Sequence, residues 1–153
     1  MIFIDNIHDV SLEVEENVVE LITRVSLAAY PNEMGGFLIG CYSSDMRRAI
    51  VKQVLIPETY VSGPVFFQRD TEGMNHKWEE LYAKGLIYLG EWHSHPNGTA
   101  SYSIMDKKAL VNIAEYDRVT IENPVMIIVA LNQESIKDVR AYYYRGGNII
   151  EYE

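Results

Sequence analysis

Cysteine is almost absent from this sequence of 153 residues, because Cys41 is the only one. One cysteine cannot form an internal disulfide, and it cannot supply a zinc cluster built from several thiolates. The near-absence of cysteine also fits a reducing compartment, so we expect a cytoplasmic protein.

Long apolar runs and basic residues are also scarce. No apolar stretch approaches the roughly 18 residues of a membrane span, and residues 1–5 lack the basic n-region of a signal peptide. Lys and Arg number 13 against 22 for Asp and Glu, which gives a net charge of −9. Because phosphate binding needs a basic face, we expect no nucleic-acid partner and no membrane association. A basic protein partner is compatible with this charge.

The rest of the composition is that of one globular domain covering residues 1–153. Hydrophobic residues make up 48% and charged residues 23% of the chain, which is long enough for a real core. Apolar periodicity and turn residues predict strands near 2–4, 36–40, 49–56, 87–95, 124–131, 139–144 and 149–152, and helices near 14–30, 71–84 and 103–116. The stretch 57–70 is irregular and aromatic, which is typical of a binding loop, and part of it also fits an edge strand. This order predicts an α/β fold with a mixed sheet flanked by helices.

Two histidines, His93 and His95, stand two residues apart in the expected strand 87–95. Side chains at i and i+2 of a strand point to the same face, so both imidazoles can reach one point in space. Asp106 follows at the start of the next helix and shares its core-facing stripe with Leu110, where a carboxylate without a partner is costly. Three such ligands leave an open position on a tetrahedral Zn²⁺, which is the catalytic arrangement.

Two features near this site allow more than one interpretation. Ser103 precedes Asp106 by three residues, so the pair also fits a capping box at the helix start. A catalytic zinc site further needs a carboxylate that accepts the proton of the attacking water. Spacing alone leaves two candidates for it: Glu91, on the strand face of the histidines, and Glu33, which lies far away in the sequence just before another strand.

The spacing of these residues resembles the JAMM motif of the JAB/MPN metalloproteases. That motif reads Glu, a variable stretch, His-Ser/Thr-His, seven residues, Ser, two residues and Asp. Every position is met, by Glu33, His93-Ser94-His95, Ser103 and Asp106. The resemblance implies one JAB/MPN-like domain, with the cytidine-deaminase-like fold, and a Zn²⁺ ion bound by His93, His95 and Asp106. It also implies that Glu33 is the general base and that the Ser103 hydroxyl steadies the oxyanion. Glu91 then fits a group that orients a ligand imidazole or forms a local salt bridge.

The sequence departs from many members of the family at two places. Tyr102 stands where proline commonly precedes the motif serine, and Glu91 replaces one of the two aromatic residues that precede the first histidine in eukaryotic members. The compact chain is more similar to the small prokaryotic JAB proteins, including those of bacterial anti-phage (CBASS) operons. The resemblance implies a zinc-dependent isopeptidase that cleaves after the C-terminus of a ubiquitin-like protein, or of a protein conjugated in that manner. It further implies regulation of an anti-phage signalling nucleotidyltransferase.

Two other functions remain open from the sequence. The same chemistry could release a small amino-acid adduct from a sulfur-carrier protein, because only the shape of the substrate groove would differ. The chain could also be an interaction module that zinc stabilises but that does not turn over substrate. Glu33 counts against this last hypothesis, because a structural zinc site needs no general base.

Overall fold

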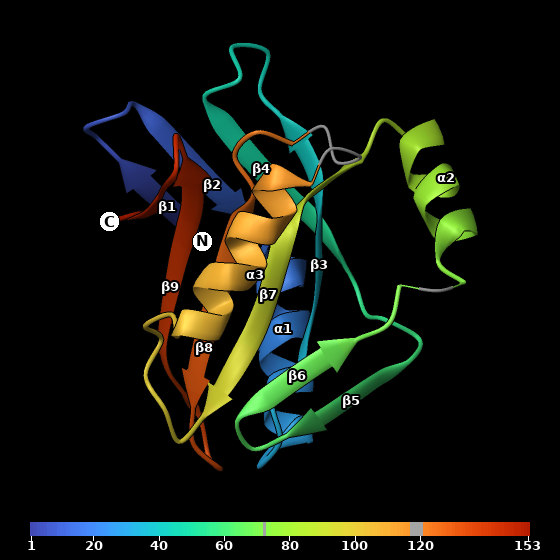
Figure 1. The fold of residues 1–153 in the computed structure, drawn as a ribbon, viewed down its shortest axis with the longest axis vertical. Helices are drawn as coiled ribbons and strands as arrows, with labels where there is room; N and C mark the ends of the chain where they lie inside the picture. Colours follow the sequence, from blue (N-terminus) through green and yellow to red (C-terminus); the bar gives the residue numbers. More distant parts are fainter. Residues whose placement is uncertain (72, 117–120) are drawn as a thin grey trace.

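The computed structural model describes residues 1–71, 73–116 and 121–153. Figure 1 shows the elements within these ranges in chain order. They are β1 (Ile2–Asp5), β2 (Val10–Val14), α1 (Glu16–Ala29), β3 (Gly35–Tyr42), β4 (Arg48–Leu55), β5 (Tyr60–Gly63), β6 (Phe66–Arg69), α2 (Asn75–Ala83), β7 (Ile87–Pro96), α3 (Ile104–Glu115), β8 (Val125–Leu131), β9 (Ile136–Arg145) and β10 (Asn148–Glu151).

One mixed sheet organises the molecule. Its strands follow the order β1-β2-β4-β3-β7-β8-β9-β10, so β7 lies inside the sheet between β3 and β8. The pairs β2–β4 and β7–β8 are parallel, and the other neighbours are antiparallel. Strands β5 and β6 form a separate antiparallel hairpin (Figure 1). The predicted α/β class, with a mixed sheet and flanking helices, is confirmed.

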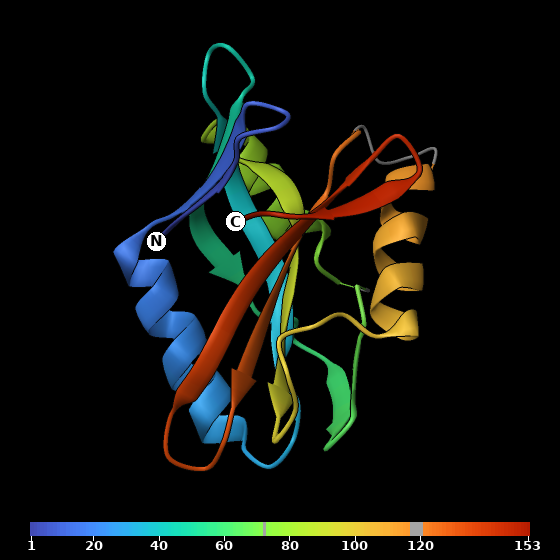
Figure 2. The ribbon, with the colours of Figure 1, turned by 90° about the vertical axis from the view of Figure 1, so that its left-hand side faces the viewer.

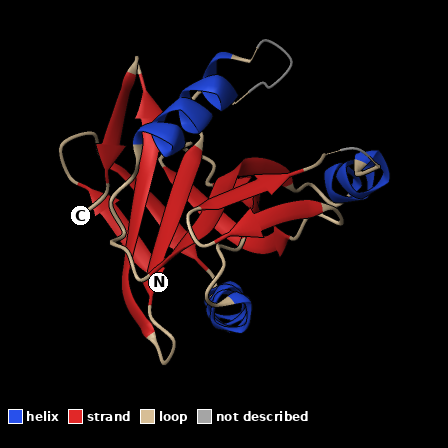
Figure 3. Ribbon diagram, turned by 60° about the horizontal axis from the view of Figure 1, so that its bottom comes forward, coloured by secondary structure: helices blue, strands red, loops and turns tan. Residues whose placement is uncertain are grey.

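The helices cover both faces of this sheet, as Figures 2 and 3 show. The alternation of side chains along β8 explains the two layers, because successive residues of a strand point to opposite faces. One set packs in the core on the side of α1: Val125, Ile127 and Val129. The other set packs under α3: Met126, Ile128 and Ala130. Both faces of β8 are therefore dry, which explains its unbroken apolar sequence.

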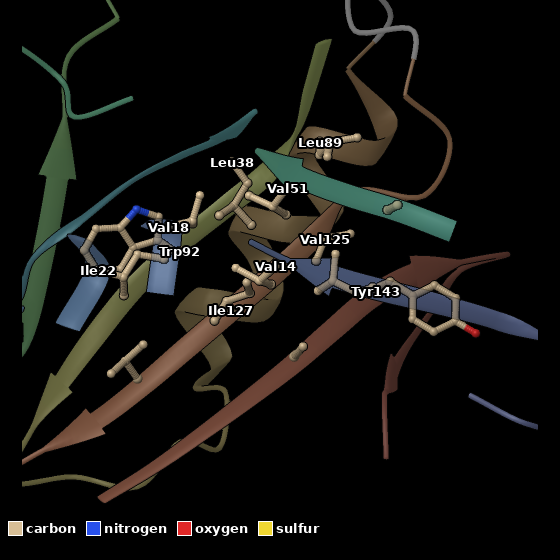
Figure 4. Packing of buried hydrophobic residues seen from close by; sticks show 14 of the residues in the cluster. Val14, Val18, Ile22, Leu38, Val51, Leu89, Trp92, Val125, Ile127 and Tyr143 are labelled. Carbon is tan, nitrogen blue, oxygen red and sulfur yellow. The ribbon is translucent and has the colours of Figure 1, made fainter. Parts of the chain in front are cut away.

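The core between α1 and the sheet is the larger one. Val18 and Ile22 lie one turn apart on α1 and are 1% and 5% exposed. They meet Trp92 of β7 and Leu38 of β3 (Figure 4). Full burial of each such side chain contributes roughly 1.5–3 kcal/mol to folding. This contact holds β7 in place through the face that is opposite to its histidines.

Helix α2 packs on the other face of the sheet, against Phe37 and Ile39 of β3. Met74, the residue just before α2, is part of the same buried cluster. Leu38, between those two β3 residues, faces α1 instead. No helix among the described residues is long and apolar enough to span a membrane.

The structure adds two elements to those expected from sequence. Residues 10–14 form a strand, β2, where only a helix beginning near Val14 was predicted. Its alternation is short, and its stability comes from parallel pairing with β4. The irregular stretch 57–70 holds the β5–β6 hairpin, of which only one edge strand was anticipated. Both strands depend on partners that local periodicity does not reveal.

A buried carboxylate on the edge strand β1 forms a hydrogen bond with β9, near the other edge of the sheet. Asp5 of β1 is 4% exposed, and its Oδ2 accepts a hydrogen bond from the Tyr143 hydroxyl of β9 at 2.7 Å and lies 2.7 Å from Nδ1 of His8. Beside it, the Ile4 and Glu153 backbones exchange two hydrogen bonds of 3.2 and 2.9 Å. Burial alone would raise the pKa of Asp5, but the hydrogen bonds from His8, Tyr143 and the backbone outweigh burial and lower the pKa well below its usual range.

This network predicts a specific acid sensitivity. Because the folded-state pKa of Asp5 is depressed, its stabilisation is present above its unfolded pKa of about 3.9 and is lost as the pH falls from there toward the folded pKa. Asp5→Asn should lower the free energy of unfolding by about 2 kcal/mol at pH 7. The difference from wild type should shrink as the pH falls below about 4, as measured by denaturant titration.

Asp138→Asn is the matched control, because Asp138 forms an exposed ion pair with Arg140. Such pairs contribute about 0–1 kcal/mol. A penalty for Asp5→Asn that stays constant down to pH 3 would contradict the linkage.

Candidate metal centre

Three side chains converge on one point beside the end of β7. His93 Nε2 lies 3.0 Å from His95 Nε2 and 3.0 Å from Asp106 Oδ1, and His95 Nε2 lies 3.5 Å from Asp106 Oδ2. Tetrahedral Zn²⁺ with bonds near 2.0–2.1 Å would separate its ligand atoms by about 3.3 Å. The two imidazoles face different oxygens of the Asp106 carboxylate, and one ligand atom from each of the three residues lies within 4.8 Å of the others. This donor set could hold a metal ion, and three ligands leave one position of a tetrahedral ion open.

A backbone carbonyl orients one of the imidazoles. His95 Nδ1 lies 2.8 Å from the carbonyl oxygen of Thr99. Because a carbonyl only accepts hydrogen bonds, Nδ1 carries the proton and the neutral ring presents its Nε2 lone pair to the site. A partner of this kind is a recurrent feature of metal-binding histidines, since it holds the ring in the ligating tautomer.

The capping box and the candidate ligand share the same carboxylate. Ser103 is the N-cap of α3, and its Oγ accepts a hydrogen bond from the Asp106 N–H at 3.1 Å. In return, Asp106 Oδ2 accepts one from the Ser103 N–H at 2.6 Å. The two interpretations of Ser103-x-x-Asp106 are thus compatible, because the cap holds the carboxylate in the rotamer that faces both histidines. The Ser103 hydroxyl hydrogen is left available for another acceptor.

Glu33 reaches the same site from the segment before β3. The β3–β7 ladder ends at the pair Gly35–His93, and Glu33 lies two residues before Gly35. From there its carboxylate is close enough to His93, His95 and Asp106 to interact with their charges. Glu33 is 9% exposed, and its N–H donates to the carbonyl of Gly63 in β5 at 2.9 Å. The structure therefore brings together all five residues that the motif selected: Glu33, His93, His95, Ser103 and Asp106.

The charges of the site act on one another. Burial raises the pKa of Glu33, and the two imidazoles only partly offset this effect. Burial opposes ionisation of Asp106, yet its hydrogen bonds with His93 and His95 hold the pKa of this carboxyl well below its usual range. Burial would lower the pKa of His95, but Asp106 and the Thr99 carbonyl outweigh burial and raise it. A metal-free site with this pattern attracts positive charge.

Glu91 occupies the histidine face of β7, as predicted, but it is engaged elsewhere. Its carboxylate pairs with the Arg69 guanidinium of β6 and accepts a hydrogen bond from the Tyr88 hydroxyl at 3.1 Å. Burial raises the pKa of Glu91 despite these partners. Of the two roles expected for it, the local salt bridge is the one observed. The second candidate proton acceptor is therefore tied to the hairpin.

Sequence reasoning did not identify Arg69 or Thr99. Thr99 acts through its carbonyl oxygen, which every amino acid possesses, so its identity carries no signal. Arg69 meets Glu91 only because the hairpin folds over β3 and β7. The Arg69 guanidinium also stacks over the Phe37 ring of β3, with its central carbon 5.2 Å from the ring centroid.

Comparisons with known proteins identify the family of this chain. Residues 15–142 match the model of the family described as prokaryotic homologs of the JAB domain. The chain belongs to this family. A relative named CD-NTase/cGAS isopeptidase, from Enterobacter hormaechei subsp. hoffmannii (strain UCI 50), is 34% identical over 120 residues, which cover 78% of this chain and 67% of the relative.

Solved structures share the fold of this JAB-family chain. A protein of Desulfitobacterium hafniense, known from its solution structure, superposes with a TM-score of 0.70 at 20% identity and covers 92% of this chain and 88% of its own. A JAB1/MPN domain protein from Archaeoglobus fulgidus superposes with a TM-score of 0.51 at 19% identity and covers 92% and 96%. The JAB/MPN-like fold expected from the motif is thus confirmed.

The metal site can be tested by stoichiometry. We expect the purified protein to bind about one zinc ion per chain. The His95→Ala variant lacks one of the converging Nε2 atoms, so it should lose this ion. Elemental analysis measures this content. Chelation should also lower the Tm of wild type, because a metal that binds only the folded state stabilises it by mass action.

His76→Ala is the matched control, because His76 is an exposed histidine on α2 and should leave the zinc content unchanged. Full zinc occupancy in His95→Ala would refute the ligand assignment.

The two functions of Ser103 can be separated. Ser103→Ala should cost about 1 kcal/mol of stability through loss of the N-cap. If the hydroxyl also donates to a developing oxyanion, kcat should fall on the order of 10²–10³-fold while zinc is retained. Ser103→Thr keeps both the cap and the donor. A less stable Ser103→Ala enzyme with full kcat per folded molecule would leave Ser103 with the cap function alone.

Proposed function

We propose that this JAB-family chain is a zinc-dependent isopeptidase of the JAMM type. Its substrate is a ubiquitin-like protein, or a protein conjugated in a ubiquitin-like manner, joined through its C-terminus to an amine. The observation that carries the proposal is the position of Glu33. A buried carboxylate beside an open metal position is needed for hydrolysis and has no use in a purely structural metal site.

His93, His95 and Asp106 would hold the zinc ion. Zinc held there would polarise the scissile carbonyl and make a water molecule acidic enough to lose its proton near neutral pH. Glu33 accepts that proton and then passes it to the leaving amine. The raised pKa of Glu33 suits both proton transfers, because the carboxylate must accept the proton from water and then release it to the amine. Ser103 donates its hydroxyl hydrogen to the carbonyl oxygen as negative charge develops there.

The β5–β6 hairpin is the proposed substrate support. It touches the site directly, because the Gly63 carbonyl accepts the Glu33 N–H. It also exposes apolar side chains: Val61 is 63%, Val65 84% and Phe66 47% exposed. Among the described residues, β5 and β6 pair only with each other as strands, so an edge of the hairpin can accept an extended peptide. An extended C-terminal tail is the ligand that this surface suits.

The biological role is proposed from the relative named CD-NTase/cGAS isopeptidase. By analogy, this chain would remove a conjugated nucleotidyltransferase from its attachment and so regulate anti-phage signalling in the cytoplasm. A sulfur-carrier protein bearing a small adduct would use the same catalytic groups, and a substrate comparison separates the two. If small adducts are the natural substrate, the enzyme should cleave a small adduct at least as fast as a protein-sized conjugate.

The decisive measurement compares the two carboxylates. Glu33→Gln should bind zinc and substrate normally, because the amide keeps the shape of the side chain. Its kcat should fall on the order of 10²–10⁴-fold, because an amide cannot accept the proton. The assay is hydrolysis of a fusion that carries a ubiquitin-like C-terminal tail, at saturating zinc and again after chelation.

Glu91→Gln is the matched control, since it removes a carboxylate from the same strand face but leaves Glu33 in place. We expect only a partial loss of activity from the weakened pairing with Arg69. An active Glu33→Gln together with an inactive Glu91→Gln would assign the base to Glu91. Wild-type turnover that persists without metal would refute the zinc mechanism.

A further inference from the structure

Ser94 stands between the two histidines but faces the opposite side of β7. It is fully buried, at 0% exposure, as expected for the face that packs toward α1. Its N–H donates to the carbonyl of Met34 at 2.7 Å, and its Oγ accepts from the Met34 N–H at 2.9 Å. Met34 is the neighbour of Glu33. One serine is therefore bonded twice to the segment that carries the proposed base.

These two bonds differ from a regular strand pairing. The β3–β7 ladder ends at the pair Gly35–His93, and Met34 and Ser94 are the next pair in register. In a regular hydrogen-bonded antiparallel pair, each residue donates its N–H to the carbonyl of the other. Here Met34 donates instead to the hydroxyl. The hydroxyl stands in for a carbonyl, so the chain can leave the ladder at Met34 without leaving a buried N–H unpaired.

We propose that Ser94 is the positioning residue for Glu33. This inference rests on the function proposed above. The Ser94 hydroxyl fixes the point at which the segment before β3 leaves the sheet. That point sets where the Glu33 carboxylate lies relative to His93 and His95. A second hydrogen bond, from the Glu33 N–H to the Gly63 carbonyl, holds the other side of the same segment.

This geometry limits which residues can take the place of Ser94. The acceptor must sit on Cβ, because a longer side chain would displace Met34 from β7. Serine and threonine meet this condition, whereas alanine removes the acceptor and leaves the Met34 N–H unpaired in the core. The side chain acts through Glu33 and does not touch the reacting atoms, since it lies on the far face of β7.

Kinetics provide the first test. Ser94→Ala should keep wild-type zinc content and KM, while kcat falls on the order of 10–100-fold, the loss expected for a catalytic group displaced by up to about 1 Å. Ser94→Thr should keep most of the wild-type kcat. The matched control is Ser26→Ala, which deletes another fully buried hydroxyl that has no hydrogen-bond partner among the described residues. It should leave kcat unchanged.

A double variant separates positioning from general damage. If Ser94 acts only through Glu33, then Glu33→Gln with Ser94→Ala should be no slower than Glu33→Gln alone. Losses that multiply would overturn the proposal, and so would full kcat in Ser94→Ala. If Ser94→Ala folds poorly, Ser94→Cys keeps a similar shape but is a weaker acceptor, and it carries the same expectations.

Hydrogen exchange provides a readout that needs no activity. In metal-free protein, the Met34 and Glu33 amides should exchange faster in Ser94→Ala than in wild type, while amides of β8 stay protected. Unchanged exchange at Met34 would refute the anchoring. If wild type does not hydrolyse the tailed fusion, the proposed function fails, whatever the exchange shows. If wild type is active, Glu33→Gln is inactive and Ser94→Ala matches wild type, only the role of Ser94 fails.

Discussion

The register of β7 between β3 and β8 is the constraint on which the rest of the structure depends. Trp92 and Ser94 point into the core beside α1, while His93 and His95 point to the other face. A slip of one residue would bury the histidines and expose the tryptophan. Gly90 helps to fix this register: its φ is +150°, and a Cβ there would lie 1.9 Å from the carbonyl oxygen of Val125. No other residue allows β8 to approach so closely.

Stability and the proposed chemistry use the same atoms. Asp106 closes the capping box of α3 and also faces both histidines, so its rotamer is fixed before any metal arrives. A ligand held in this way loses little further freedom on binding, which favours affinity. The cost is an ionised carboxylate that is only 14% exposed, and the imidazoles offset this cost in the metal-free protein.

Local sequence patterns were enough for the groups that lie on one element or at one helix start. The period of two placed His93 with His95, and the position of Ser103 and Asp106 at the start of a helix gave both the cap and the candidate ligand. The period says nothing about which strands become neighbours. The motif resemblance, not the periodicity, selected Glu33. The contact of Glu33 with Gly63 depends on a hairpin of which only one strand was anticipated.

The remaining features depend on pairings between distant segments. The strand β2 exists because β4 pairs with it, and Glu91 is occupied because the hairpin brings Arg69 to it. The hydrogen bond from Met34 to the Ser94 hydroxyl is equally invisible in the sequence, since a buried serine is compatible with many environments. The irregular aromatic stretch marked where the hairpin lies but not how it pairs.

The carbonyl that orients His95 explains a property of the motif itself. Seven residues separate His95 from Ser103, and the motif sets their number without naming them. Thr99 lies within this segment and contributes only a backbone oxygen, so side-chain changes there leave the contact in place. Insertion or deletion of one residue would move that oxygen and the start of α3 together. The contact with His95 therefore depends on the length of this loop and not on the side chain of Thr99.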